Sequence, residues 1–196
     1  MKLNLATILT LIRIAAIPVI VACFYWQAPY ARPLAGILFG VAAITDLIDG
    51  YIARNYGQMS RFGAFLDPVA DKLIVAIAMI LLVQSDPKWQ IDFLAMIIIG
   101  REITISALRE WMATVGARDT VAVGWPGKVK TTLQMFGIAF MVYEEPFLGF
   151  EIYGIGFLLL IIAAGMTLWS MFAYLRAAWP SMRAGAEEGA AGNSGS

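Results

Sequence analysis

The sequence predicts an all-α integral membrane protein with six transmembrane helices. Of its 196 residues, 60% are hydrophobic and only 14% are charged, whereas a soluble globular domain carries about 25% charged residues. The chain also contains six mostly apolar runs close to the length of about 20 residues that a helix needs to cross a bilayer. Polar residues, glycine and proline separate these runs, as expected for turns between helices.

The six apolar runs predict the positions of the helices. The expected spans are Leu5–Trp26, Leu34–Ile52, Phe62–Gln84, Ile91–Ala113, Val129–Val142 with a start further upstream, and Tyr153–Tyr174. Residues 1–184 are therefore interpreted as one transmembrane domain. Residues 185–196 are small and polar, which predicts a flexible tail.

Positive charges are distributed unevenly between the two ends of the predicted helices. One end would hold Lys2, Arg54, Arg61, Arg118, Lys128, Lys130, Arg176 and Arg183. The loops at the other end hold only Arg32 and Lys88. Because lysine and arginine are enriched in cytoplasmic loops, we expect a multi-pass protein with both termini in the cytoplasm.

The composition limits the ligands and metal sites that the chain can be expected to have. The formal net charge is zero, so no basic field indicates nucleic-acid binding. The chain has no histidine, which leaves oxygen ligands for a metal and favours Mg²⁺, Ca²⁺ or Mn²⁺ over zinc. The single cysteine, Cys23, lies in an apolar run and is interpreted as a packing residue.

Four aspartates lie in or beside the second and third predicted spans. They are Asp46, Asp49, Asp67 and Asp71. A single carboxylate at the bilayer centre costs several kcal/mol. Between Thr45 and Leu73 the positive side chains are Arg54, Arg61 and Lys72. These are too few to neutralise the cluster, so we expect a bound divalent metal, in a polar pocket near the cytoplasmic face.

Helical spacing arranges these residues in two stripes. The first stripe comprises Asp46, Asp49, Gly50, Ala53 and Arg54, and the second comprises Gly63, Asp67 and Asp71. A short link makes the two helices antiparallel neighbours, so their acidic faces can meet. Four facing carboxylates suit two divalent ions, which can clamp the attacking and leaving oxygens of a phosphoryl-type transfer.

The small residues and the arginine of the first stripe suit a nucleotide. Gly50 and Ala53 leave room against the helix, and Arg54 offers a guanidinium fork to a phosphate. Two structural explanations stay open at this point. Gly50 and Gly63 could serve close helix packing, and the aspartates could be salt-bridged structural groups.

The ordered pattern from Asp46 to Asp71, D-x2-D-G-x2-A-R-x8-G-x3-D-x3-D, resembles the signature of the CDP-alcohol phosphotransferase family. Four further segments resemble its branch of bacterial phosphatidylglycerophosphate synthases. They are Asn4 with residues 7–13, residues 61–72, Arg101-Glu102 with residues 106–111, and residues 127–134.

The resemblance implies transfer of a phosphatidyl group from CDP-diacylglycerol to sn-glycerol 3-phosphate, with release of CMP, in phospholipid biosynthesis. It implies Mg²⁺ or Mn²⁺, as two ions on Asp46, Asp49, Asp67 and Asp71. CDP-diacylglycerol would contact Asp46, Asp49, Gly50, Ala53, Arg54, Gly63 and Asp67. Asp71 would be the catalytic base that takes the proton of the acceptor hydroxyl, as a carboxylate is the most plausible base in a chain without histidine.

The phosphate of the acceptor needs a second, basic site. The expected residues are Arg101, Arg109, Lys128 and Lys130. Arg101 and Arg109 are eight positions apart, so they share one helix face. Alternatively, these residues follow the cytoplasmic bias of positive charge, and Arg101 could instead pair with an acid on another helix.

The resemblance also implies a homodimer in the bacterial cytoplasmic (inner) membrane, in contact with membrane lipids. Two other functions stay open. The acceptor could be another alcohol, such as inositol phosphate. The aspartates could also line a divalent-cation transporter, although an arginine in a cation path is unfavourable.

Overall fold

The computed structural model describes the backbone of residues 5–56, 61–114 and 125–193. Side chains in these ranges are described except those of residues 5–6, 47–56, 61, 64, 125–128 and 180–193. The described backbone forms six α-helices and, between Phe147 and Phe150, one isolated bridge. The predicted all-α class with six helices is therefore confirmed for this part of the chain.

Each helix corresponds to one of the predicted spans, and α1 ends one residue before its predicted span does. The helices are α1 (Leu5–Tyr25), α2 (Ala31–Tyr56), α3 (Arg61–Ser85), α4 (Trp89–Thr114), α5 (Trp125–Tyr143) and α6 (Ile152–Asn193). Prolines lie near several of the starts: Pro29 and Pro87 precede α2 and α4, and Pro126 lies in the first turn of α5. Proline has no amide hydrogen to donate, which the first turn of a helix does not require.

The end of α6 differs from the expectation. Composition predicts a flexible tail from Gly185, but the backbone of α6 continues as a helix to Asn193. The segment contains several alanines and two glutamates, which are good helix formers and offset the cost of its glycines. The domain boundary at residue 184 stays a prediction.

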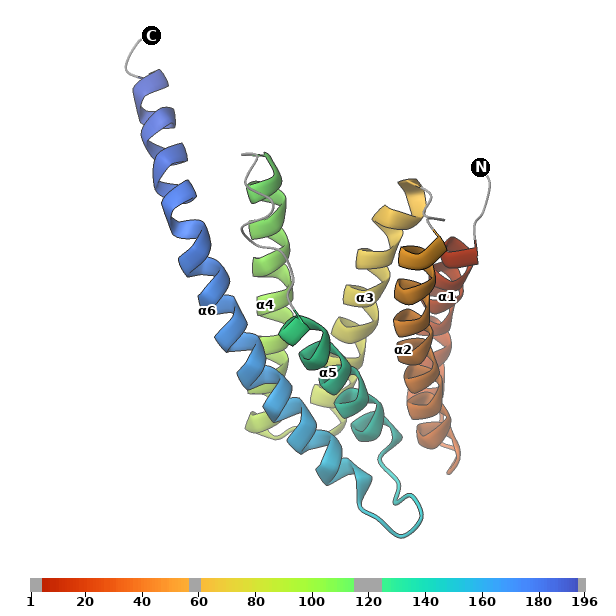
Figure 1. Ribbon diagram of the computed structural model, residues 1–196. Helices are drawn as coiled ribbons and strands as arrows, with labels where there is room; N and C mark the ends of the chain where they lie inside the picture. The colour runs from red at the N-terminus through yellow and green to blue at the C-terminus, as the bar shows by residue number, and fades with distance from the viewer. Residues whose placement is uncertain (1–4, 57–60, 115–124, 194–196) are drawn as a thin grey trace.

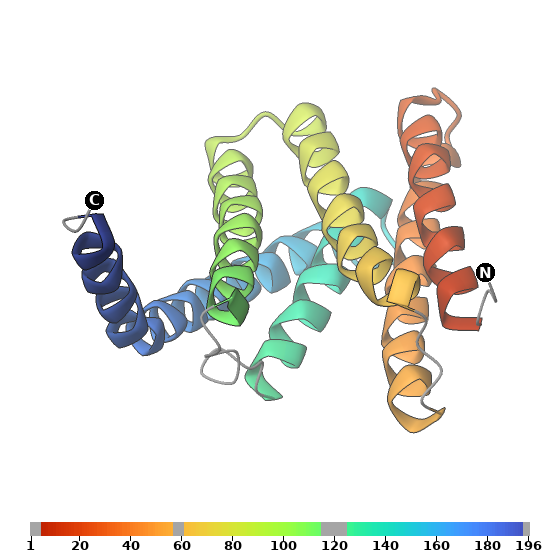
Figure 2. The ribbon, with the colours of Figure 1, turned by 90° about the horizontal axis from the view of Figure 1, so that it is seen from above.

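The helices form two groups that diverge toward the end where both termini lie (Figure 1). One group contains α1, α2 and α3, the other contains α4 and α6, and α5 lies between them. The view from above shows α5 in the same intermediate position (Figure 2). Accordingly, α5 packs against α6, α2 and α3, while α1 packs against α2 and α3. The backbones of the two groups are therefore farthest apart on the side of the termini.

Glycines permit the closest helix contacts of α5. A Cβ added to Gly36 of α2 would lie 2.5 Å from the Cα of Tyr143, and one added to Gly156 of α6 would lie 2.7 Å from the carbonyl oxygen of Gly137. Real side chains do not tolerate such distances. Small residues thus let the backbones approach closely, as in many membrane helix pairs.

The apolar core occupies the end of the bundle where the helices converge. It includes buried side chains such as Phe39, Met79, Ile98, Ile138 and Leu160. A second, smaller cluster joins α4 to α6 through Ile105, Leu108, Met112 and Ala178. The larger cluster thus holds all six helices together, and the smaller one joins only α4 and α6.

Large apolar side chains also cover the outside of the bundle. Ile12, Val41, Ile80, Ile103 and Trp169 are exposed on α1, α2, α3, α4 and α6. The described side chains of α5 include no exposed large apolar residue. Within the described residues, two segments are long and apolar enough to cross a membrane, Thr7–Tyr25 and Ile152–Trp179. The length and apolar composition of α1 and α6 are consistent with membrane association.

Candidate active site

The inner face of α1 changes character along its length. Thr7, Thr10 and Arg13 are each only 2% exposed and lie near its amino-terminal end, whereas Ile17 and Ile20 continue the same face into the apolar core. The spacing of three or four residues places all five on one side of the helix. A buried polar group needs hydrogen-bond partners, and for Arg13 these come from α2 and α3.

Three of the four predicted aspartates meet between α2 and α3. Asp46 of α2 and Asp67 and Asp71 of α3 can each offer a ligand oxygen, and these three atoms lie within 4.8 Å of one another. Asp67 and Asp71 are four residues apart and therefore point to the same side of α3. The prediction that the two acidic faces meet is confirmed for these residues.

Arg13 supplies a positive charge to this cluster. Its Nη1 atom lies 2.5 Å from Oδ1 of Asp71, 3.0 Å from Oδ1 of Asp46 and 3.4 Å from Oδ1 of Asp67. Thr10 donates a further hydrogen bond of 3.3 Å to Oδ1 of Asp67. The expectation that too few cations could reach the aspartates considered only residues 45–73, and the structure corrects it: one comes from α1.

Two features of the sequence could have identified Arg13. It interrupts an apolar run that is long enough to span the membrane, where an isolated charge marks a functional or structural site. It also follows Thr7 and Thr10 at intervals of three, which defines a polar stripe on an otherwise apolar helix. Neither feature identifies the partners of Arg13, because Asp67, for example, is 54 positions away in the chain.

The donor set suits a hard divalent cation. Three carboxylates, one from α2 and two from α3, provide the oxygen ligands that Mg²⁺, Mn²⁺ and Ca²⁺ prefer. Their side chains remain partly exposed, with 21% for Asp46, 35% for Asp67 and 39% for Asp71, so an ion could reach them. The cluster therefore fits a divalent metal ion, with Arg13 beside it as a second counter-charge.

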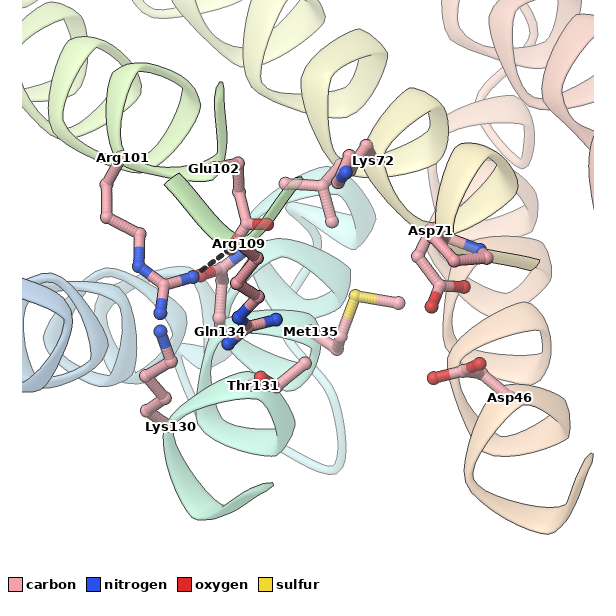
Figure 3. Close-up of a pocket in the computed structure, with 12 residues that line it drawn as sticks. Asp46, Asp71, Lys72, Arg101, Glu102, Arg109, Lys130, Thr131, Gln134 and Met135 are labelled. Carbon is pink, nitrogen blue, oxygen red and sulfur yellow. Dashed lines mark hydrogen bonds and ion pairs between the residues drawn. The ribbon is translucent and has the colours of Figure 1, made fainter. Parts of the chain in front are cut away.

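A cavity of about 210 Å³ connects the acidic cluster with basic residues of α4 and α5. It is lined by Asp46, Pro68, Asp71, Lys72, Val75, Arg101, Glu102, Arg109, Lys130, Thr131, Gln134 and Met135. In Figure 3, Asp46 and Asp71 lie at one side of this pocket, and Arg101, Arg109 and Lys130 lie at the other. Met135 and Thr131 lie between the two sides. The pocket thus has an acidic end and a basic end.

The cations of the basic end have spare hydrogen-bonding capacity. Lys130 is 4% exposed, and its Nζ has no hydrogen-bond partner among the described residues. Arg101 is 6% exposed and pairs at 2.6 Å with Glu102 of its own helix, and among the described side chains no acid of another helix pairs with it. The guanidinium of Arg109 lies 5.8 Å from the ring centre of Tyr174. A buried ammonium without a partner is costly, so this end is suited to receive an anion.

The remaining predicted site residues are placed less completely. Gly63 is buried near the amino-terminal end of α3, on the helix that carries Asp67 and Asp71. Five other predicted residues lie in helices but outside the described side chains: Asp49, Gly50, Ala53 and Arg54 in α2, and Lys128 in α5. Their contribution to the pocket stays a prediction.

The sequence of this chain matches a known protein family over most of its length. The sequence model of the CDP-alcohol phosphatidyltransferase family matches residues 3–169. This chain belongs to that family. The match begins before Arg13 and includes all the residues that line the pocket. The matched region thus contains both the acidic and the basic end of the pocket.

Several bacterial relatives of this family member are similar over nearly their whole length. Proteins named CDP-diacylglycerol–glycerol-3-phosphate 3-phosphatidyltransferase from Salmonella choleraesuis (strain SC-B67), Shigella flexneri and Escherichia coli (strain K12) are each 49% identical to it over 178 residues. The matched region is 91% of this chain and 96% of each relative.

Proposed function

We propose that this family member transfers the phosphatidyl group of CDP-diacylglycerol to sn-glycerol 3-phosphate, giving phosphatidylglycerophosphate and CMP, in the biosynthesis of phosphatidylglycerol and cardiolipin. One observation carries the proposal: a single pocket joins a cluster of carboxylates to a cluster of cations. The first can hold a metal-bound diphosphate, and the second can hold the phosphate of the acceptor. The names of its relatives point to the same reaction.

Asp71 is the residue proposed to take the proton. The acceptor hydroxyl attacks the phosphorus that bears the lipid, a new phosphorus–oxygen bond forms, and the bond to the oxygen of CMP breaks. The proton of the hydroxyl passes to the carboxylate of Asp71. This carboxylate lines the pocket that also contains the basic residues, so it can meet a hydroxyl whose phosphate is held at the other end. Positioning of this kind can supply a large part of a rate enhancement.

The nucleotide half of the site is assigned to the acidic stripes. We assign CDP-diacylglycerol binding to Asp46, Asp49, Gly50, Ala53, Arg54, Gly63 and Asp67. Asp46, Asp49, Asp67 and Asp71 are the proposed ligands of Mg²⁺ or Mn²⁺, with two ions in the complete site. When bound, such ions would neutralise the diphosphate and stabilise the attacking and leaving oxygens. The convergence of Asp46, Asp67 and Asp71 supports this assignment.

The acceptor half is assigned to Arg101, Arg109, Lys128 and Lys130. Arginine and lysine donors form strong, charge-assisted hydrogen bonds with phosphate oxygens. Three of the four line the pocket, and the ammonium of Lys130 has no other hydrogen-bond partner in the described part of the structure. The basic end favours a phosphorylated alcohol over an uncharged one.

The same proposal places the protein in the bacterial cytoplasmic (inner) membrane. Six membrane crossings, with both termini in the cytoplasm, would position the pocket near the cytoplasmic face. The exposed apolar side chains on five helices support contact with lipid, and the two termini lie at the same end of the bundle (Figure 1). We also propose that residues 1–184 form the catalytic domain and that the protein acts as a homodimer.

An acceptor panel tests this proposal. Detergent-purified protein is assayed for CMP release from CDP-diacylglycerol with glycerol 3-phosphate, inositol phosphate, glycerol or serine as acceptor. We expect release with glycerol 3-phosphate and Mg²⁺ or Mn²⁺, and loss of release in EDTA. Preference for inositol phosphate would replace the acceptor, and cation flux across vesicles without CMP release would contradict an enzymatic role.

A further inference from the structure

We propose that Arg13 is a positioning residue that acts as a resident counter-ion of the acidic cluster and competes with the divalent cation for its carboxylates. The inference rests on the proposed metal-binding role of Asp46, Asp67 and Asp71. It adds a residue of α1 to a site otherwise built from α2 and α3. Its experiment measures metal binding directly, so it does not depend on the identity of the acceptor.

The contacts of a single nitrogen carry the argument. Nη1 of Arg13 lies 2.5 to 3.4 Å from one oxygen of each of three carboxylates. These are the carboxylates that converge to within 4.8 Å as possible metal ligands. The guanidinium nitrogen and a metal cation would therefore bind the same oxygens. Because both are positive, each weakens the binding of the other by charge repulsion.

Burial prevents Arg13 from leaving this neighbourhood. Its side chain is 1% exposed, and the same face of α1 continues into the apolar core at Ile17. A buried charge without its partners is strongly destabilising. The guanidinium can shift among the carboxylates when a metal binds, but its charge stays beside the site.

This placement gives Arg13 two effects of opposite sign. Without a metal, it reduces the repulsion among three clustered carboxylates and links α1 to α2 and α3. With a metal, the same charge lowers the affinity of the carboxylates for the cation. An ordinary structural ion pair would have the first effect without the second.

The test compares wild type and Arg13→Gln as full-length proteins in detergent, using Mn²⁺ as the probe. Thermal unfolding is followed in EDTA and in saturating Mn²⁺, and Mn²⁺ affinity is measured by titration. In EDTA, we expect Arg13→Gln to unfold at a Tm lower by a few degrees. Saturating Mn²⁺ should remove most of this difference, because binding to the folded state stabilises it. The variant should bind Mn²⁺ about tenfold more tightly, because a nearby unit charge is gone.

Arg32→Gln is the matched control. Arg32 also forms an ion pair, 2.7 Å from Glu144, but it lies in the first turn of α2, outside the residues that line the pocket. Its variant should lose equal stability with and without Mn²⁺ and keep the wild-type Mn²⁺ affinity.

Three results would overturn the inference. They are a loss of stability in Arg13→Gln that Mn²⁺ leaves unchanged, an unchanged Mn²⁺ affinity, and a weaker one. If Arg13→Gln does not fold, Arg13→Lys carries the test. It keeps the charge with fewer donors, so its Mn²⁺ affinity should equal or modestly exceed that of wild type, and weaker binding would contradict the inference. If wild type itself binds no Mn²⁺, the proposed metal site fails instead.

Discussion

The buried charges at the two ends of the pocket are compensated differently. At the acidic end, Asp46, Asp67 and Asp71 share an internal cation, Arg13. At the basic end, Arg101 pairs with Glu102, but the ammonium of Lys130 has no hydrogen-bond partner among the residues described. The acidic end is thus partly compensated from within, and the basic end more clearly requires an external anion.

Under the proposed function, this difference predicts how substitutions at each end affect the reaction. The acidic end is held by contacts among three helices, and we propose that it can exchange one cation for another. At the basic end, we propose that the bound ligand supplies the missing negative charge. We therefore expect substitutions at the acidic end to affect turnover, and substitutions at the basic end to affect mainly the affinity for the acceptor.

The largest expected effect is at Asp71. Asp71→Asn keeps the size of the side chain but removes the proposed base, so kcat should fall by at least about 10²–10⁴-fold. Binding of CDP-diacylglycerol should change much less, because Asp46 and Asp67 remain. CMP release and lipid binding are measured on the same purified protein. Asp92→Asn, on α4 and outside the pocket lining, is the control, and an active Asp71→Asn enzyme would remove Asp71 from the catalytic role.

The second effect is at the basic end. Lys130→Ala removes a charged hydrogen-bond donor, and a hydrogen bond of this kind contributes about 1.5–3 kcal/mol. The KM for glycerol 3-phosphate should therefore rise roughly 10- to 100-fold. The KM for CDP-diacylglycerol should stay within a few-fold of wild type. Steady-state kinetics with each substrate varied in turn separates the two, and Lys88→Ala is the control outside this pocket. If instead CDP-diacylglycerol binding weakened, Lys130 would belong to the nucleotide half.

The smallest effect concerns a polar cluster near the opposite end of α3. Asp86 accepts hydrogen bonds of 2.5 Å from Tyr153 and 2.9 Å from Lys88. Partial desolvation raises the pKa of Asp86, but these hydrogen bonds and the charge of Lys88 outweigh it and hold the pKa below its ordinary value. A lowered pKa gives a contribution to stability that is complete above the unfolded pKa of about 3.9 and is lost as the pH falls through the folded value.

Thermal unfolding between pH 3 and pH 7 tests this contribution. Asp86→Asn should lower the Tm by about a degree at pH 7 and cost progressively less at acid pH. Catalysis should be unaffected, because Asp86 does not line the pocket. Tyr153→Phe, which removes only the donor hydroxyl, should have a smaller effect of the same sign. A constant difference between wild type and Asp86→Asn across this range would contradict the assignment.

Much of the fold could be predicted because its signals are local. Apolar runs of sufficient length located all six helices, and only their ends differ, most of all at the carboxyl-terminal end of α6. The facing of Asp67 and Asp71 follows from a spacing of four residues on one helix. The short connection between α2 and α3 made their contact with Asp46 predictable as well.

The sequence by itself determined the helical class, the acidic stripes and the family of the protein, because periodicity and spacing act over a few turns of one helix. Tertiary structure decided that Arg13 enters the acidic cluster and that Lys130 faces the same pocket as Asp71. These relations depend on how α1 and α5 pack against α3, including the close approaches of α5 at glycines. Such packing results from many weak contacts summed over the whole bundle, and no short motif encodes it.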